Sequence, residues 1–199
     1  MVIHMKTIAH NIETEIEIQK SRFITIIKYI TTKEEAKETI LKAKEKYPNA
    51  THYTYAYILD SDMHVSDDGE PSGTAGNPML NVLQKQDLHF TLAIVIRYFG
   101  GIKLGAGGLV RAYSGSVRNA LMQTSIIELE PGYKIQLVYD YQDSKRMNSI
   151  LSKLEIKEKE FTETIRIIAI GNQKDLEYLK QNNISYQIIE KLYIKKRTN

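Results

Sequence analysis

The sequence has no cysteine and no tryptophan, and it contains only 4 prolines among its 199 residues. Without cysteine the chain has no disulfides, no thiolate metal ligands and no cysteine nucleophile, a composition typical of the cytoplasm. No apolar run approaches the roughly 18 residues of a membrane-spanning helix, so we expect no membrane partner. The N-terminal stretch also lacks the apolar core and small-residue cleavage site of a secretory signal. We therefore predict a cytoplasmic protein.

The chain also lacks a large excess of either charge, with 27 basic and 24 acidic residues and a formal net charge of +3. Residues 1–132 hold 14 basic and 15 acidic residues, whereas residues 133–199 hold 13 and 9, so the positive excess lies in the last third. This balance does not indicate the strongly basic surface of a typical nucleic-acid-binding domain. Any binding to nucleic acid would have to depend on a local patch.

Hydrophobic periodicity predicts an α+β chain of two domains, residues 1–131 and 132–199, divided at the Pro-Gly pair of EPGYK. The first domain is predicted to have strands at 14–18, 22–30, 52–59, 91–99 and 125–130, and helices at 31–47, 77–86 and 108–123. The second is predicted to have strands at 133–141, 155–163, 164–170 and 184–194, and helices at 143–154 and 172–182. That order of strand, helix, two strands, helix and strand predicts a ferredoxin-like sandwich.

Local signals add detail to the predicted helices. Thr32, with a glutamate three residues later, predicts a capping box at the start of the first helix. Asn77 followed by proline predicts the start of the second helix. The third helix is predicted to bury an apolar face made of Leu109, Tyr113, Val117, Ala120 and Leu121.

Glycine is scarce, yet 5 of the 11 glycines fall in RYFGGIKLGAGGLVRAY, residues 97–113. The dinucleotide-binding pattern fails there because position 110 is valine, and the Walker pattern fails because position 106 is alanine. The predicted strand, turn and helix still leave free backbone N–H groups that favour an anion near Gly105, Gly107 and Gly108. The alternative is that the glycines only permit a tight turn and close packing.

The segment DSDMHVSDDGEPSGTAG, residues 60–76, is predicted to be a long polar loop, and its part SDDGEPSGTAG, residues 66–76, is acidic and rich in turn residues. Asp67, Asp68 and Glu70 could bind a hard cation such as Mg²⁺ through oxygen, but their spacing is not that of a calcium loop. The hydroxyl of Thr74 could cap a helix or donate a hydrogen bond. The alternative is an ordinary solvated loop.

Tyr53, Tyr55 and Tyr57 alternate along one predicted strand and therefore share one face of its sheet. If that face is exposed, the rings could stack on nucleic-acid bases. If a helix covers it, the rings are ordinary aromatic packing. The sequence leaves both alternatives open.

Two of these motifs together resemble the signature of the YigZ/IMPACT family. SDDGEPSGTAGNPML precedes VIRYFGGIKLGAGGLVRAY at the family's spacing, and KSRFI and ATHYTYAY also match. The resemblance implies an N-terminal domain like the second domain of a small-subunit ribosomal protein, followed by a ferredoxin-like domain. The family's eukaryotic relatives regulate translation by competing for a protein partner. No family-level catalytic residue can be transferred to this chain.

We therefore expect a non-enzymatic binding protein linked to translation, with RNA, the ribosome or a translation-associated protein as its partner. In the RNA or ribosome case, Arg22, Arg97, Lys103 and Arg111 would contact phosphates. The alternative is a phosphate- or metal-dependent enzyme that binds a phosphorylated substrate between residues 66–76 and 100–108. A third alternative is a protein-interaction module whose glycines serve the fold alone. No cofactor or metal is expected, and the sequence leaves the oligomeric state open.

Overall fold

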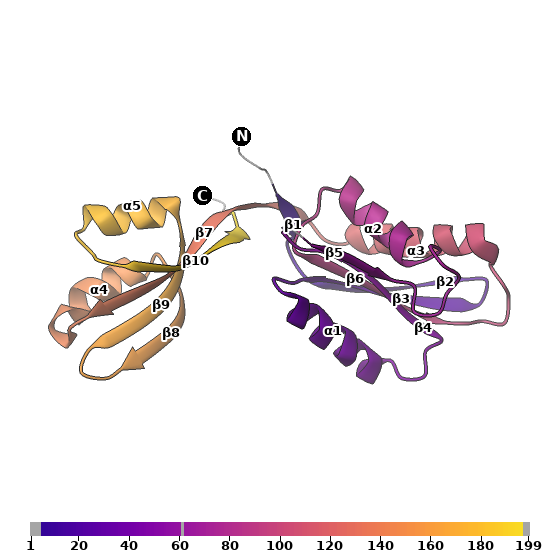
Figure 1. The fold of residues 1–199 in the computed structure, drawn as a ribbon, viewed down its shortest axis with the longest axis horizontal. Coiled ribbons are helices and arrows are strands. Elements are labelled where there is room, and N and C mark those ends of the chain that lie inside the picture. The colour runs from indigo at the N-terminus through magenta and orange to yellow at the C-terminus, as the bar shows by residue number, and fades with distance from the viewer. Residues whose placement is uncertain (1–4, 61, 197–199) are drawn as a thin grey trace. The chain divides into compact units, whose positions relative to one another are not determined.

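The computed structural model describes residues 5–60 and 62–196 of a mixed α/β chain. Its contacts divide the chain into two compact units, Met1–Glu128 and Leu129–Asn199 (Figure 1). No helix among the described residues is long and apolar enough to span a membrane.

Unit 1 contains an antiparallel sheet in the strand order β2-β3-β6-β4-β5. The strands are β2 (Ile12–Ile18), β3 (Ser21–Tyr29), β4 (His52–Ile58), β5 (Met63–Ser66) and β6 (Thr91–Tyr98). The apolar run of β6 lies at the centre of the sheet and is buried except at its last residue. A strand that is covered on both faces has a continuous run of apolar residues, and this run allowed the sequence to predict the strand.

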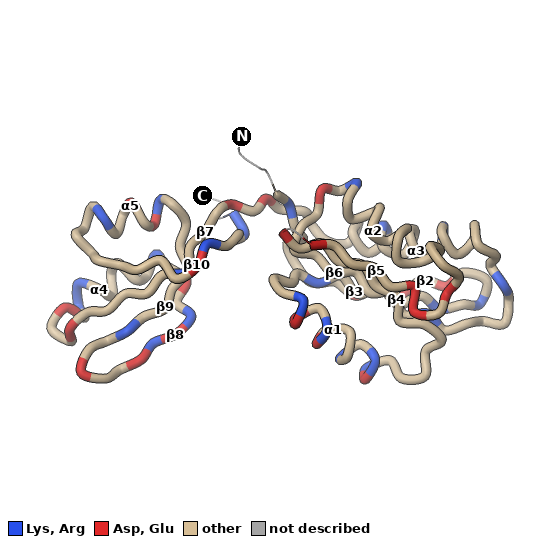
Figure 2. The backbone as a smooth tube through the Cα atoms, in the orientation of Figure 1, with Lys and Arg blue, Asp and Glu red and all other residues tan. Residues whose placement is uncertain are grey.

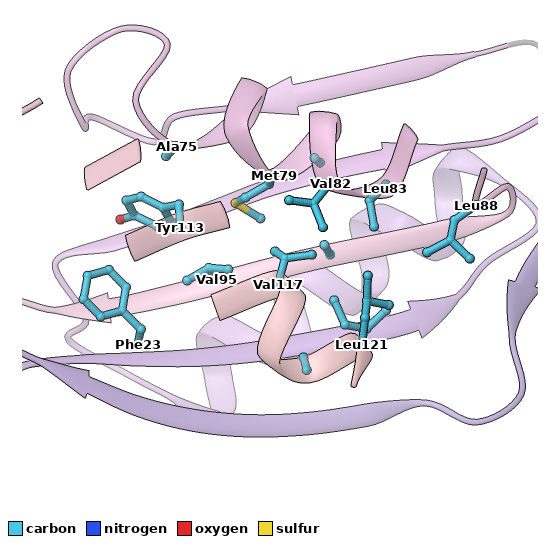
Figure 3. Packing of buried hydrophobic residues seen from close by; sticks show 14 of the residues in the cluster. Phe23, Ala75, Met79, Val82, Leu83, Leu88, Val95, Tyr113, Val117 and Leu121 are labelled. Atoms are coloured by element: carbon cyan, nitrogen blue, oxygen red, sulfur yellow. The ribbon is translucent and has the colours of Figure 1, made fainter. Parts of the chain in front are cut away.

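Helices cover both faces of this sheet (Figure 1). They are α1 (Lys33–Lys46), α2 (Gly76–Lys85) and α3 (Gly105–Leu121). Phe23 and Val95 point from the sheet into a core shared with α2 and α3, shown in Figure 3. On the other face, Lys28 of β3 donates a hydrogen bond to Thr39 of α1. The predicted apolar face of α3 is buried, so this prediction is confirmed. Thr32 caps α1 as predicted, but the carboxylate of Glu35 accepts its hydrogen bonds from Thr31, so only half of the predicted capping box is present.

In unit 2 the strands lie in the order β8-β9-β7-β10, and every neighbouring pair is antiparallel. Its elements are β7 (Ile126–Tyr139, from Leu129 onward), η1 (Tyr141–Asp143), α4 (Ser144–Leu151), β8 (Glu155–Phe161), β9 (Ile165–Asn172), α5 (Gln173–Gln181) and β10 (Gln187–Lys195). Ile135 and Leu137 of β7 pack with residues of both helices in one core, so α4 and α5 cover the same face.

Several predicted boundaries are wrong. The sequence predicted a turn at Pro131, but β7 runs through it as one strand. Proline lacks an N–H, yet it is tolerated here because Pro131 pairs only with β10, and pairing with β9 begins at Gly132. A short strand, β1 (Lys6–Ile8), which pairs with the start of β7, was not predicted. The predicted loop at 60–76 contains the edge strand β5.

Gly100 explains part of the glycine cluster. A Cβ atom at this position would lie 2.0 Å from the carbonyl carbon and oxygen of Lys20, in the turn between β2 and β3. The glycine therefore allows two backbones to pass in contact. Gly101 and Gly105 have φ angles of +84° and +69°, in the left-handed region that residues with a Cβ atom rarely adopt. Gly107, by contrast, faces open space except for the guanidinium of Arg111, 3.5 Å from a built Cβ.

We predict that Gly100→Ala lowers the free energy of unfolding by about 3 kcal/mol or more, because backbone atoms of Lys20 would have to move. The matched control is Gly107→Ala, which should change stability by less than about 1 kcal/mol, in the stabilising direction. Denaturant titrations followed by circular dichroism measure both. Equal effects of the two substitutions would contradict the close-packing role of Gly100.

Candidate functional site

The acidic loop between β5 and α2 is folded around Asp67. One carboxylate oxygen of Asp67 accepts hydrogen bonds from the backbone N–H groups of Ala75 and Gly76, at 3.0 and 2.8 Å. The other oxygen accepts one from Gly73 at 2.7 Å. Asp67 thus occupies the N-terminus of α2 with a negative charge. The sequence predicted Asn77 as the cap, and this was wrong because α2 begins at Gly76 and its N-cap residue is Ala75, two residues before Asn77.

Burial opposes the ionisation of Asp67, but the hydrogen bonds from Gly73, Gly76 and Ala75 outweigh it and hold the pKa of this carboxyl below its usual value. Figure 2 shows the loop as a red segment at one end of the sheet of unit 1.

Asp68 attaches the same loop to β4. Its carboxylate accepts a hydrogen bond from the backbone N–H of Tyr53 at 2.6 Å. Its carbonyl oxygen accepts one from Nδ1 of His52 at 2.8 Å. Asp68 and Gly69 have φ angles of 43° and 86°, and the N–H of Glu70 donates to the carbonyl of Asp67, so these four residues form a tight turn. This turn directs the side chain of Glu70 into the protein.

Glu70 forms the centre of a buried polar cluster. Its Oε1 atom accepts hydrogen bonds from Nη1 of Arg97 at 2.7 Å and from the hydroxyl of Tyr113 at 2.6 Å. The side chains of Glu70 and Arg97 are only 3% and 6% exposed. Nε2 of His52 lies 3.8 Å from the same carboxylate oxygen. We call Glu70, Arg97 and Tyr113 the buried triad. It joins the acidic loop, the central strand β6 and helix α3.

Tyr113 is the neutral hydrogen-bond donor of the buried triad. Burial, together with the hydrogen bond to the Glu70 carboxylate, raises the pKa of the Tyr113 hydroxyl far above its usual value. Its ring meets that of Phe23 edge to face at 5.4 Å, and Figure 3 shows the two side by side. Tyr113 therefore remains a neutral hydrogen-bond donor to Glu70.

Arg97 connects the buried triad to the glycine-rich turn. Its Nη2 atom donates to Oγ of Ser21 at 3.4 Å, and the same oxygen accepts from the backbone N–H of Gly100 at 3.1 Å. The guanidinium carbon lies 5.4 Å from the ring centre of Phe23 and 5.4 Å from that of Phe99. Within the described part of the chain, Nε of Arg97 has no hydrogen-bond partner.

The turn itself is exposed. We define the glycine-turn surface as the side chains of Phe99, Ile102, Lys103, Val110 and Arg111. Among residues 5–60 and 62–196, Lys103 and Arg111 have no ion-pair partner. The first turn of α3 has no acidic residue, and no side chain caps it. Gly105 and Gly107 lie in this first turn and are exposed, whereas Gly108 is half-buried.

The other predicted site residues have different roles. Arg22 is exposed but makes two hydrogen bonds to the carboxylate of Glu15, at 2.8 and 3.0 Å. Arg97, expected to contact phosphates, points into the core because it shares the face of β6 that α3 covers. Thr74 is buried and donates to the carbonyl of Pro71 at 2.6 Å. The sequence predicted Glu70 for a cation site and Arg97 for a phosphate site. No local signal in the sequence indicated that the two side chains form an ion pair.

The three tyrosines of β4 lie on the side of the sheet that faces α1. Tyr57 is 7% exposed, and its ring stacks on His64 of β5, as does the ring of Tyr55. The hydroxyl of Tyr53 donates to the carbonyl of Tyr47 at 2.6 Å. These contacts favour the packing alternative over base stacking.

The carboxylates of the acidic loop are all engaged in the fold. Asp67 and Asp68 bind backbone N–H groups, and Glu70 binds Arg97 and Tyr113. Among the described residues, no group of three or more His, Cys, Asp or Glu side chains is arranged to hold a metal ion. The loop is thus built to position Glu70.

We predict that Glu70→Gln lowers the free energy of unfolding by about 3–5 kcal/mol, because the Arg97 charge would remain buried without a counter-charge. Tyr113→Phe keeps the ring packing and should cost about 1.5–3 kcal/mol, the value of a hydrogen bond to a charged group. The control is Glu15→Gln, which removes an exposed ion pair and should cost less than about 1 kcal/mol. Equal costs at Glu70 and Glu15 in denaturant titrations would contradict the role of the triad.

For Asp67→Asn we predict a loss of about 1–2 kcal/mol at pH 7, because a neutral amide is a weaker acceptor at the helix N-terminus. The folded-state pKa of Asp67 is lowered, so its contribution is present above the unfolded pKa of about 4 and is lost as the pH falls through the folded value. The stability difference between wild type and variant should therefore shrink below about pH 4. A difference that stays constant from pH 7 to pH 2 would contradict this.

Comparison with known proteins agrees with the motifs. The family model of the Impact N-terminal domain matches residues 19–121. The chain is 42% identical over 168 residues to "IMPACT family member YvyE" of Bacillus subtilis (strain 168), covering 82% of this chain and 77% of that protein. It is 37% identical over 146 residues to "IMPACT family member YigZ" of Escherichia coli (strain K12), covering 71% and 72%.

A solved structure described as "Crystal structure of an hypothetical protein" is similar with a TM-score of 0.69 and 29% identity, covering 94% of this chain and 97% of that one. The resemblance inferred from the two motifs is thereby confirmed, and the chain belongs to the IMPACT family.

Proposed function

We propose that this chain is a non-enzymatic cytoplasmic binding protein that acts on translation, and that it contacts its partner through the glycine-turn surface. Membership of the IMPACT family supports the link to translation, because the family resemblance implies that eukaryotic relatives are translational regulators. The partner is RNA, the ribosome or a translation-associated protein. We further propose that unit 1 is a domain like the second domain of a ribosomal protein and that unit 2 is a ferredoxin-like domain.

One observation carries the choice of surface. Several residues of the two motifs are used inside the protein, since Glu70, Arg97 and Gly100 all make internal contacts. Lys103 and Arg111, in contrast, are exposed beside the uncapped first turn of α3. Exposed cations and free helix N–H groups favour an anionic partner. Neither side chain contributes to the core, so both are available to a partner.

The enzyme alternative has less support. It required the carboxylates of residues 66–76 to face a substrate beside residues 100–108, but each of them already has partners in the fold. A carboxylate that holds a buried arginine and a tyrosine is poorly placed to bind a cation as well. The proposal therefore includes no catalytic step.

We predict that the protein co-sediments with ribosomes at low salt and that this association weakens as salt rises, because cations contact anionic groups. The double variant Lys103→Ala/Arg111→Ala should weaken the association by about tenfold or more. The control, Lys37→Ala/Lys85→Ala, removes the same charge from exposed sites on α1 and α2 and should have little effect. No co-sedimentation of the wild type at low salt, or equal effects of both pairs, would contradict the proposal.

A further inference from the structure

The glycine-turn surface is apolar as well as basic. Phe99, Ile102 and Val110 are 46%, 42% and 37% exposed. Single exposed apolar residues are common on proteins, but here three lie within one segment of 12 residues, between the end of β6 and the second turn of α3. Clustered exposed apolar side chains next to charged ones are typical of interaction sites. The surface can therefore bury apolar groups of a partner.

The charge of this surface is of one sign. The sequence from Leu88 to Ile127 contains no aspartate or glutamate, but it contains Arg97, Lys103, Arg111 and Arg118. The carboxylates of Asp67 and Asp68 in the acidic loop bind backbone N–H groups, and among the described residues neither forms an ion pair with Lys103 or Arg111. Charge complementarity therefore requires an anionic partner, and a second copy of the same basic surface would be repelled.

The surface is also held in place before any partner binds. The backbone N–H of Phe99 donates to Oγ1 of Thr51 at 3.0 Å, and the guanidinium of Arg97 packs on its ring. Gly100 is fixed by the hydroxyl of Ser21 and by contact with the turn at Lys20. A turn that is already ordered loses little conformational entropy when it binds. The buried triad thus supports the surface from below by holding Arg97.

The apolar residues distinguish between two kinds of anionic partner. Single-stranded RNA is bound by aromatic or guanidinium planes on which bases stack. Phe99 and Arg111 provide such planes, but the aliphatic side chains of Ile102 and Val110, which make up the rest of the apolar part of the surface, do not. Unit 1 contains 14 basic and 14 acidic residues in Met1–Glu128, so it has no long-range attraction for a polyanion. A protein segment with carboxylates and apolar side chains matches both properties of the surface.

From this match we infer that the glycine-turn surface binds an acidic protein segment whose apolar side chains pack on Phe99, Ile102 and Val110. The carboxylates of that segment pair with Lys103 and Arg111 at the edge of the contact. This inference rests on the proposed function and specifies the chemical class of the partner.

The test places a photo-crosslinking residue in the surface, as Ile102→p-benzoylphenylalanine in the full chain bound to ribosomes. After irradiation, we expect an adduct that protease removes and nuclease does not. Mass spectrometry should place the crosslink in a segment rich in aspartate and glutamate. Adding Lys103→Ala/Arg111→Ala to the same chain should reduce the adduct by about tenfold or more.

A matched pair of apolar substitutions completes the test. Ile102→Ala should weaken co-sedimentation by about fivefold, whereas Met122→Ala, which removes a 79% exposed side chain at the other end of α3, should not change it. A nuclease-sensitive adduct, or a crosslink to a protein segment without acidic residues, would overturn the inference while leaving the proposed function intact. A crosslink to a second copy, or persistent co-sedimentation without any adduct, would overturn the inference and the proposed contact surface, but not the link to translation. Absence of co-sedimentation by the wild type would overturn both.

Discussion

The ion pair between Glu70 and Arg97 is the contact on which the rest of unit 1 depends. Both side chains are almost fully buried, so each would carry a large desolvation cost without the other. The Tyr113 hydroxyl donates a hydrogen bond to the same carboxylate oxygen, so helix α3 is also attached to this ion pair. One carboxylate therefore fixes the positions of the acidic loop, the central strand and a helix that are far apart in the sequence.

This internal cluster gives an exposed turn a defined shape. Arg97 reaches Ser21 on one side and packs on the ring of Phe99 on the other, while Ser21 also binds the backbone of Gly100. Gly100 lets the turn lie directly on the backbone of Lys20. The two motifs that identify the family are thus parts of one structure, because the acidic motif supplies the counter-charge for the arginine that supports the glycine-rich motif.

Function then depends on the residues that this structure leaves free. The proposed surface combines exposed apolar side chains with Lys103 and Arg111, and it lies on a unit of balanced charge. Short-range contacts, more than long-range attraction, would have to select a partner for such a surface. Such behaviour agrees with the proposed action on translation through binding.

The sequence by itself determined the family, the alternation of strands and helices, the capped start of α1 and the buried face of α3, because these depend on local periodicity and on motifs. It wrongly predicted a turn at Pro131. The proline lies within strand β7, where it is tolerated because it pairs with a neighbouring strand on one side only. It also grouped Arg97 with the exposed cations. Only the tertiary structure decided that Arg97 is buried, because its partners Glu70 and Ser21 lie 27 and 76 positions away and their approach depends on the packing of the whole unit.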